Sequence, residues 1–383
     1  MNRLRIAGVR ACGSGYPNAE QTIRILRAYD VALISDLGYS LPDSLHLWRF
    51  RNQTAFGKVT TMVRIGLWNT LSFLRVLAAR EDRNVPVYIP YPSIFFLWLL
   101  SWVPTAVRPR CIADAYISIW DSLFRDRRGG ELSLPARLTK SFEGRALRAA
   151  TLVLVDTKAN KDMMVADFDL TPERVFAWPL AIDEARFRRC NEPELTHGRI
   201  KVLFVGTLIP LHGLPVLLDV IRTLQSEARF DFRIIGDGQQ APLVEQFMLE
   251  FPGAGLTWKR EWCSLDEIAA EIAAADICLG VFGGDAKAAR VLPFKLYMYL
   301  ASGKPVITQS KLSTPEGVPF PPVEAVDVGH EHELANGIRR LADDAALRGQ
   351  RGSEGRAYYR QWLANSELAQ RWAGALRLFV SDP

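Results

Sequence analysis

Short apolar runs alternate with longer amphipathic segments along most of the chain. In the first half, runs that predict buried strands lie at residues 4–9, 31–35, 87–89, 111–113, 151–155 and 175–178. In the second half they lie at residues 201–205, 230–235, 256–258, 277–282 and 306–308. Continuous apolar runs of this length are typical of parallel strands that are covered on both faces.

Apolar residues recur at helical spacing between these runs. The predicted helices span residues 20–28, 56–80, 138–149, 157–167, 214–225, 242–250, 265–275, 332–345, 347–363 and 368–380. Strands that alternate with helices predict parallel sheets with right-handed crossovers. The pattern therefore predicts an α/β fold.

One break interrupts the alternation, at residues 182–198, which are polar, charged and without a period. A chain of 383 residues is long enough for two domains. We expect a Rossmann-like N-terminal domain at residues 1–183, a Rossmann-like C-terminal domain at 199–364, and a last helix at 365–383 that packs back on the first domain. Ligands of such sheets bind at the carboxyl ends of the strands, so we expect the two sheets to face a central cleft.

Residues 85–107 contain no charged side chain. Prolines leave only residues 93–103 for an unbroken helix, roughly 16 Å long and too short to span a bilayer. One interpretation is a buried strand at 87–89 followed by a core helix. The other is a membrane-interface surface formed by aromatic and apolar side chains, namely Phe95, Phe96, Trp98, Leu99 and Trp102.

The stretch from residue 275 to residue 308 combines a strand, a glycine turn, a basic loop, a helix and a strand. Lys287, Arg290 and Lys295 surround the start of this helix, Pro293 suits its first position, and Gly303 suits its end. A helix N-terminus with cations beside it favours a phosphate or diphosphate. A solvated charged loop is the alternative.

Three glycine turns follow strands in the second half. They contain Gly206 and Thr207, then Gly236, Gly238 and Gln239, then residues 283–284. Glycine after a strand lets the backbone approach a ligand closely, so the three turns together describe a pocket for a nucleotide diphosphate.

The loop after the first strand contains Gly13, Ser14, Gly15 and Tyr16. It does not have the G-x-G-x-x-G spacing of a dinucleotide-binding loop. It is a candidate contact for the acceptor or for donor phosphates, and a plain tight turn is the alternative.

Charge and cysteine content argue against several classes of protein. The net charge of +5, from 47 basic and 42 acidic residues, is compatible with phosphate ligands or anionic lipid and does not indicate nucleic-acid binding. The five cysteines include no C-x-x-C pair, so neither a disulfide framework nor a zinc site is indicated. The N-terminus lacks the pattern of a signal peptide. These features predict a cytoplasmic protein. If the apolar residues 85–107 form a membrane-interface surface, the protein is expected to contact the inner face of the cell membrane.

Several ordered motifs carry a resemblance. They are VLFVGTLIPLHGLPVLLDVI, FRIIGDGQ, AADICLGVFG and KAARVLPFKLYMYLASGKPVIT in the second half, and DAYISIWDSLFRDRR and FEGRALRAATLVLVDTKAN in the first. With them the chain resembles the GT-B glycosyltransferases, in particular the bacterial surface-polysaccharide enzymes of family 4. The resemblance implies transfer of a hexose, with retention, from a nucleotide-diphosphate-sugar to a saccharide or lipid-linked acceptor. It implies neither a metal ion nor another cofactor.

The resemblance also implies a set of donor-binding positions. They are Gly206, Thr207, His212, Gly236, Gly238, Gln239, Lys287, Arg290, Lys295, Met298 and Glu316. Two glutamates typical of the family are replaced, by Arg290 and by Met298. The cations near the helix start are therefore expected to bind the diphosphate, and His212 is either a phosphate or sugar contact or a loop-packing residue.

Asp114 follows a predicted strand and is the first candidate catalytic residue, since a carboxylate there can position or deprotonate an acceptor hydroxyl. A helix cap or a salt bridge is the alternative. Asp121 is the second candidate. Two other functions stay open: a non-enzymatic relative that serves as a scaffold, because both glutamates are missing, and a nucleotide-sugar epimerase.

Overall fold

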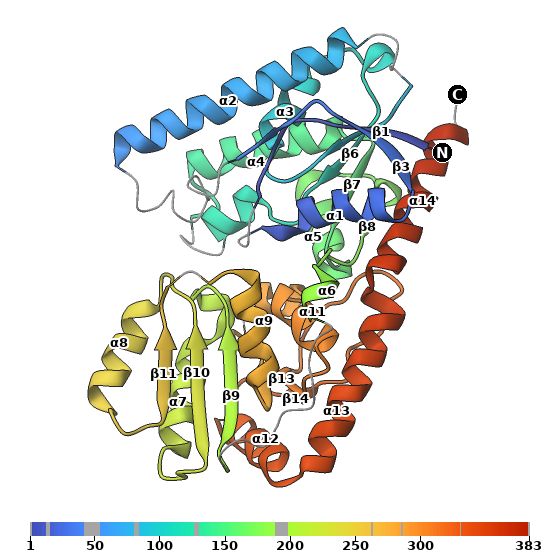
Figure 1. Cartoon of the computed structure of the whole chain (residues 1–383). Helices are drawn as coiled ribbons and strands as arrows, with labels where there is room; N and C mark the ends of the chain where they lie inside the picture. Colours follow the sequence, from blue (N-terminus) through green and yellow to red (C-terminus); the bar gives the residue numbers. More distant parts are fainter. Residues whose placement is uncertain are drawn as a thin grey trace. The chain divides into compact units, whose positions relative to one another are not determined.

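The structure is a computed structural model that divides into two compact units. It describes residues 2–12, 16–41, 54–79, 84–125, 130–187, 198–261, 263–284, 286–329 and 331–381. The N-terminal unit comprises Met1–Ala181 and Asn365–Pro383, and the C-terminal unit comprises Ile182–Ala364. Figure 1 shows the last helix, α14 (Asn365–Ser381), in red beside the strands of the N-terminal unit. The final segment thus belongs to the core of the first unit.

The N-terminal unit is built on a six-stranded parallel sheet with the order β3-β1-β5-β6-β7-β8. Its strands are β1 (Asn2–Ile6), β3 (Ala32–Asp36), β5 (Val87–Ile89), β6 (Cys111–Asp114), β7 (Leu152–Val155) and β8 (Val175–Ala177). A short separate pair is formed by β2 (Val9–Arg10) and β4 (Tyr39–Ser40). The strand order reverses direction at β1 and β5, which is where sheets of this kind bind ligands.

Helices cover both faces of this sheet. They are α1 (Pro17–Ala28), α2 (Ala55–Ala78), α3 (Ile94–Leu100), α4 (Leu134–Ala149), α5 (Lys158–Phe168) and α14. One core cluster joins the strands to α3, α4 and α5, and another joins them to α1 and α14. In the second cluster the ring of Trp372 packs edge-on against Tyr88 at 4.9 Å and Trp178 at 5.5 Å between ring centroids.

The apolar segment at 85–107 forms β5, α3 and a 3-10 turn at Thr105–Val107. Phe96, Leu97 and Leu100 are buried in the core. The core interpretation is therefore confirmed for the inward side of α3, and the placement of Phe96 on a membrane surface is wrong. Trp102, just beyond the helix, is 61% exposed. Among the described residues, no helix has both the length and the apolar character that a bilayer crossing requires.

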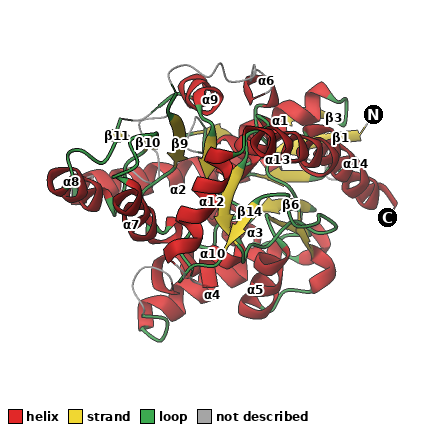
Figure 2. Cartoon of the chain, turned by 90° about the horizontal axis from the view of Figure 1, so that it is seen from below, coloured by secondary structure: helices red, strands yellow, loops and turns green. Residues whose placement is uncertain are grey.

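The C-terminal unit has a second six-stranded parallel sheet, with the order β11-β10-β9-β12-β13-β14. Its strands are β9 (Ile200–Val205), β10 (Phe230–Ile235), β11 (Leu256–Lys259), β12 (Ile277–Leu279), β13 (Val306–Gln309) and β14 (Glu324–Val326). In chain order this is 3-2-1-4-5-6, the arrangement of a dinucleotide-binding Rossmann sheet. Figure 2 shows helices in red on both sides of the yellow strands.

The helices of the C-terminal unit form the two covering layers and the site described below. They are α6 (Glu184–Phe187), α7 (Leu214–Leu224), α8 (Ala241–Glu250), α9 (Leu265–Ala274), α10 (Ala286–Arg290), α11 (Phe294–Ala301), α12 (Glu331–Asp343) and α13 (Ala345–Tyr358). The last continues as a π-helix at Tyr359–Leu363. The expected linker thus begins with a helical turn, and residues 188–197 of it lie outside the described residues.

The structure corrects three local predictions in the 275–308 stretch. The strand expected at 277–282 ends at Leu279, although the Gly280 N–H still donates to the Ile307 carbonyl of β13 at 2.8 Å. A Cβ atom at Gly280 would be 2.4 Å from Thr308 Oγ1. The expected basic loop contains α10. Pro293 is the residue before α11 rather than its first residue. Outside this stretch, β14 is a strand that the apolar pattern did not predict.

Candidate functional site

The switch point of the C-terminal sheet lies between β9 and β12, where the strand order reverses. Gly206 follows β9 and Gly280 follows β12, so both loops leave the sheet at its carboxyl edge. In open parallel sheets this edge is the place of ligand binding. His212, at the end of the loop that begins with Gly206, and Lys295, which is remote in sequence, both lie against Gly206 here.

Lys295 is a buried cation, with 5% of its surface exposed. Its Nζ atom lies 3.7 Å from the ring centroid of Phe204 and donates a hydrogen bond to the Gly280 carbonyl at 3.3 Å. Burial lowers the pKa of this amino group well below its usual range, and no carboxylate of the described residues offsets the effect. Burial alone therefore favours the neutral amine, and a bound anion would favour the ammonium. A buried ammonium without a carboxylate is costly, and a phosphate oxygen would supply the opposite charge.

His212 ends the 3-10 turn Pro210–His212 and is also buried. Its ring packs edge-on against Phe204, 5.6 Å between centroids. Burial first, and then the neighbouring Lys295, lower the pKa of the imidazole well below its usual value, against a smaller opposing effect of a hydrogen bond with the Thr207 backbone. The ring is therefore neutral at physiological pH and contributes a polar contact rather than a positive charge.

Gly206 makes this packing sterically feasible. A Cβ atom there would lie 2.8 Å from His212 Cε1 and 2.9 Å from Lys295 Nζ. Any larger residue would therefore push His212 or Lys295 away from the loop. Thr207 follows with its side chain exposed to solvent.

The turn that contains Gly236 and Gly238 packs directly against the Gly206 loop. Gly236 has a φ of +136°, and a Cβ atom on it would lie 2.0 Å from the Gly206 carbonyl oxygen. A Cβ atom on Gly238 would lie 2.8 Å from the backbone of Leu208. In the structure these two glycines are therefore required for contact between loops. Their contact with a donor, and that of the exposed Gln239, stay predictions.

Two further cations belong to α10, which lies against the Pro210–His212 turn. Ala288 of α10 and Leu211 of the turn share a small apolar cluster. Lys287 and Arg290 therefore share an element that packs beside His212, although they are far from it in sequence. The structure thus distinguishes the three cations: Lys295 is buried, and the other two are partly exposed.

The two remaining donor candidates lie farther along the chain. Met298 is on α11, one turn after Lys295, and is 5% exposed. Glu316 is partly exposed in a turn between β13 and β14 that is closed by a hydrogen bond from the Val318 N–H to the Pro315 carbonyl. Roles of these two residues in donor binding stay predictions.

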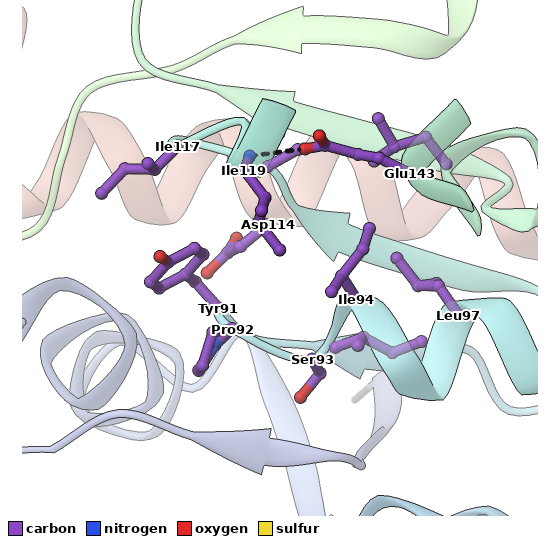
Figure 3. Close-up of a pocket in the computed structure, with 12 residues that line it drawn as sticks. Tyr91, Pro92, Ser93, Ile94, Leu97, Asp114, Ile117, Ile119 and Glu143 are labelled. Atoms are coloured by element: carbon purple, nitrogen blue, oxygen red, sulfur yellow. Dashed lines mark hydrogen bonds between the residues drawn. The ribbon is translucent and has the colours of Figure 1, made fainter. Parts of the chain in front are cut away.

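The N-terminal unit has a small pocket of its own, at the carboxyl ends of β5 and β6, with a cavity volume of about 20 Å³ (Figure 3). Most of its lining is apolar, with two carboxyl side chains. The lining residues are Ile89, Tyr91, Pro92, Ser93, Ile94, Leu97, Asp114, Ala115, Ile117, Ile119, Glu143 and Leu147. A cavity of this size has room for about one water molecule.

Asp114 is the last residue of β6 and is 7% exposed. The Tyr88 hydroxyl donates to its Oδ2 atom at 2.5 Å. Burial raises the pKa of this carboxyl to about 7, and hydrogen bonds from Tyr88 and the Tyr91 backbone oppose the rise. A carboxyl group with a pKa near 7 is suited to accept or donate a proton at physiological pH.

Glu143, on α4, is the second buried carboxyl of this pocket. Burial raises its pKa to about 7 as well. Its oxygens accept hydrogen bonds from the Ile119 and Trp120 N–H groups at 2.9 and 2.8 Å and from Ser118 at 3.1 Å; Figure 3 draws the first of these. Glu143 therefore fixes the 118–120 loop, which forms one wall of the pocket.

The other N-terminal candidates have different places. Asp121 begins the π-helix Asp121–Arg125 and pairs with Arg125 at 3.5 Å, so the structure assigns it a salt bridge and does not include it in the pocket lining. Gly13, Ser14 and Gly15 lie outside the described residues. The ring of Tyr16 lies 5.5 Å from that of Tyr91, which lines the pocket.

Sequence reasoning did not find four of these residues. Phe204 and Gly280 frame the Lys295 ammonium, and Tyr88 and Glu143 accompany Asp114. Each is a common residue type in a buried strand, a loop or a helix, and no spacing links it to its partner. Only the position of Tyr88 within an apolar strand, where a hydroxyl needs a hydrogen-bond partner, was a usable signal.

No group of three or more His, Cys, Asp or Glu side chains that could hold one metal ion occurs in the part of the chain that the structure describes. The expectation that the reaction uses no metal stays a prediction.

A family comparison covers the C-terminal unit. Residues 199–344 match the model of the family described as Glycosyl transferases group 1. The matched residues include β9, the Gly206 loop and Lys295. No curated protein sequence matches the chain significantly.

Solved structures resemble the whole chain in fold. HepE from Anabaena, solved in complex with UDP, is 14% identical, with a TM-score of 0.66 and coverage of 98% of this chain and 100% of that one. The sucrose-phosphate synthase of Thermosynechococcus elongatus is 13% identical, with a TM-score of 0.68 and full coverage of both chains. The UDP-forming α,α-trehalose-phosphate synthase of Burkholderia vietnamiensis is 14% identical, with a TM-score of 0.69 and coverage of 100% and 98%. These likenesses show that the chain has the GT-B fold.

Proposed function

We propose that this chain, a GT-B protein whose residues 199–344 form a group 1 glycosyltransferase domain, transfers a hexose from a nucleotide-diphosphate-sugar to a saccharide or lipid-linked acceptor. The observation that carries the proposal is the buried Lys295 ammonium, which has no carboxylate partner among the described residues and lies at the switch point of a Rossmann sheet. The structural neighbour HepE was solved in complex with UDP and with UDP-glucose. A uridine nucleotide is therefore the first donor to test.

The proposed chemistry uses charge at the leaving group. As the bond between sugar and diphosphate breaks, negative charge develops on the diphosphate. A fixed ammonium stabilises this charge more in the transition state than in the ground state, so it accelerates the reaction. Lys295 has this role, with neutral His212 as a polar contact and with Lys287 and Arg290 of α10 as further cations. Retention of configuration and independence of metal ions belong to the proposal, as does family 4.

On the acceptor side, we assign Asp114 the role of positioning or deprotonating the acceptor hydroxyl. Support comes from its pKa of about 7 and its place in the wall of an apolar pocket. A lipid-linked acceptor implies a cytoplasmic enzyme at the inner face of the membrane. The pocket and the Lys295 site belong to different units, and the expected cleft between the domains stays a prediction.

The test is calorimetric titration of the protein with UDP and with UDP-glucose. The Lys295→Met variant keeps the apolar stem and removes the charge, so we expect UDP binding to weaken by about 1.5–3 kcal/mol, the value of a charged hydrogen bond. The control is Lys201→Met, a lysine in β9 at the opposite end of the same sheet. Equal affinity in all three proteins would overturn the assignment of Lys295.

The same experiment separates the alternative functions. Arg290 and Met298 occupy the positions where the family resemblance implies glutamates, and their absence is the reason for testing a non-enzymatic scaffold. UDP-glucose that binds and is neither hydrolysed nor transferred to any saccharide would favour the scaffold. UDP-glucose converted to an isomeric sugar without an acceptor would identify an epimerase.

A further inference from the structure

Helix α2 has an inverted distribution of side chains. The side chains that it buries against the N-terminal unit include three polar ones, Thr61, Asn69 and Ser72. The large apolar side chains that it exposes are Phe56, Val59, Met62, Val63, Leu67, Leu71 and Leu74. A surface helix normally has the opposite arrangement, with apolar residues toward the core.

The polar inner face is held by specific hydrogen bonds. Ser72 Oγ accepts from the Gly8 N–H at 2.8 Å and donates to the Leu37 carbonyl at 2.8 Å. These bonds tie α2 to the loop after β1 and to the segment after β3. The orientation of the helix is therefore fixed: Val76 lies in the core with Phe73 packed against it, and the exposed apolar residues named above face outward.

The outward residues form one stripe. Phe56, Val63, Leu67 and Leu74 recur at helical steps and are 82%, 66%, 55% and 54% exposed. Figure 1 shows α2 along the edge of the N-terminal unit. A contiguous exposed apolar surface of this kind marks a site of protein or membrane interaction.

Charge distinguishes between these two occupants. The helix contains Lys58, Arg64 and Arg75 and no acidic residue. Arg64 and Arg75 lie about three turns apart on one side of the stripe, and their guanidinium groups stack on Trp68 at 4.4 Å and on Tyr39 at 4.9 Å. A second copy of this helix would bring like charges together with no carboxylate to pair them. An anionic bilayer surface offers both hydrocarbon and negative charge.

Helix α3 and the residues just after it add aromatic side chains and an arginine beside α2. A Cβ atom on Gly66 of α2 would lie 4.0 Å from the ring of Phe95, which stacks on Trp98. Trp98 in turn contacts the exposed Trp102, and the Arg145 guanidinium lies 3.7 Å from the Trp102 ring centroid. Tryptophan beside arginine is typical of the interface between lipid headgroups and hydrocarbon.

We infer that the exposed face of α2 docks on an anionic membrane surface, with the helix axis along the surface. A helix with an apolar face, flanking cations and few acidic residues binds in this way without crossing the bilayer. The apolar stripe enters the boundary between headgroups and acyl chains, and Arg64 and Arg75 contact lipid phosphates. Docking needs neither donor nor acceptor, so it stands or falls independently of sugar transfer.

The test is co-sedimentation of the full chain with vesicles of phosphatidylcholine alone and of phosphatidylcholine mixed with phosphatidylglycerol. We expect binding to the anionic vesicles, reduced by high salt. The double variant Val63→Asp, Leu67→Asp should lower the bound fraction at least about tenfold, because two apolar side chains are replaced by anions. Both positions are exposed, so the urea midpoint should stay near that of the wild type.

The matched control is Leu249→Asp, an 83% exposed leucine on α8 of the C-terminal unit. It should bind vesicles like the wild type. The Arg64→Glu, Arg75→Glu variant should lose the preference for anionic over neutral vesicles. Unchanged binding in the Val63, Leu67 variant would overturn the inference. So would a wild-type dimer in size-exclusion chromatography that this variant converts to a monomer, since the stripe would then join two copies.

Discussion

At the scale of single residues, burial separates groups that look alike in the sequence. Lys287, Arg290 and Lys295 are three cations close to one helix start, and the sequence gives them equal weight. In the structure only Lys295 of these three loses its solvation, because α11 places its Nζ atom against Phe204 and the Gly280 carbonyl. Of these three cations, Lys295 therefore gains most from an anion bound beside its Nζ atom.

The same argument applies to the aspartates. Asp114 ends β6 and Asp121 comes after it, and both are buried, yet their partners differ. Asp121 has the Arg125 guanidinium beside it and forms a salt bridge with it. Asp114 has a tyrosine hydroxyl and apolar walls, which do not balance its desolvation. We therefore propose Asp114, rather than Asp121, for the proton-transfer role.

The raised pKa of Asp114 predicts a pH-dependent stability. Its carboxyl has a pKa of about 7 in the folded state against 3.8 as its ordinary value, so the folded state binds the extra proton between these values. This stabilisation is complete below about pH 4 and is lost as the pH rises to about 7. In the wild type, the free energy of unfolding should fall by about 2–4 kcal/mol between pH 4 and pH 7 because of Asp114. Asp114→Asn should remove this part of the fall, measured by urea denaturation at several pH values.

The control for this prediction is Asp162→Asn, an exposed aspartate on α5 of the same unit. Its stability curve should keep the slope of the wild type. If Asp114→Asn also keeps that slope, Asp114 is ionised in the folded state across the range. As a general base, Asp114 should in addition contribute about 10²-fold or more to the transfer rate at pH 7, which the same variant would lose.

At the scale of elements, the glycine turns show how the sequence and the structure differ. The sequence correctly marked Gly206 and Gly236 as places of close approach. It assigned the approach to a ligand, because a glycine after a parallel strand often has that purpose. The structure shows that each also accommodates another part of the protein: the Gly206 carbonyl lies against Gly236, and His212 and Lys295 lie against Gly206.

This contact predicts a strong effect of one methyl group. In Gly236→Ala the new Cβ atom would meet the Gly206 carbonyl oxygen at 2.0 Å, at a φ of +136° that alanine rarely adopts. We expect a loss of about 3 kcal/mol or more in the free energy of unfolding of the C-terminal unit, measured by urea denaturation. UDP affinity should fall as well, since the Gly206 loop must move.

A glycine of a different kind is the control. Gly349 lies inside α13, and a Cβ atom on it would meet nothing within 4 Å. Gly349→Ala should therefore stabilise the protein by about 0.5–1 kcal/mol through its better helix propensity. Two glycine-to-alanine changes of opposite sign would establish that space and φ decide the outcome. Similar effects in both variants would contradict this.

At the scale of the whole molecule, the N-terminal unit is formed by two separate segments of the chain, whereas the C-terminal unit is formed by one. After the C-terminal unit ends at Ala364, α14 completes the N-terminal unit. Trp372 of this helix is 1% exposed and packs against Tyr88, which also donates to Asp114. The last helix therefore supports the pocket from behind the sheet.

Because α14 belongs to the N-terminal unit, a substitution in its core face should destabilise that unit and not the C-terminal one. Trp372→Ala should lower the stability of the N-terminal unit by about 3–5 kcal/mol, the effect of removing a buried aromatic side chain. UDP binding should stay at the wild-type level, because the Lys295 site lies in the other unit. Urea denaturation followed with and without UDP measures both, since a ligand stabilises only the unit that binds it.

The exposed Leu378 on the same helix is the control, and Leu378→Ala should leave both quantities near the wild-type values. If Trp372→Ala abolished UDP binding while the C-terminal unit stayed folded, the two units would be coupled more closely than this division of the chain indicates.

The sequence by itself determined the class of this protein. The strands of both sheets, except β14 and the short β2 and β4 pair, follow from apolar runs, because a buried parallel strand needs no alternation. The long helices follow from their period and end within a few residues of the predicted bounds, apart from α4, which begins four residues earlier at Leu134, and the π-helical end of α13. The glycine turns and basic cluster also follow, since backbone freedom and charge are properties of local sequence.

Only the tertiary structure decided which residues act together. Lys295 meets Phe204, and Asp114 meets Tyr88, across separations that no local pattern records. Burial sets the charge state of these groups, and burial depends on every element packed around them. The same holds for α2: its pattern predicted a helix with an apolar side, and the Ser72 hydrogen bonds to Gly8 and Leu37 turned that side away from the core.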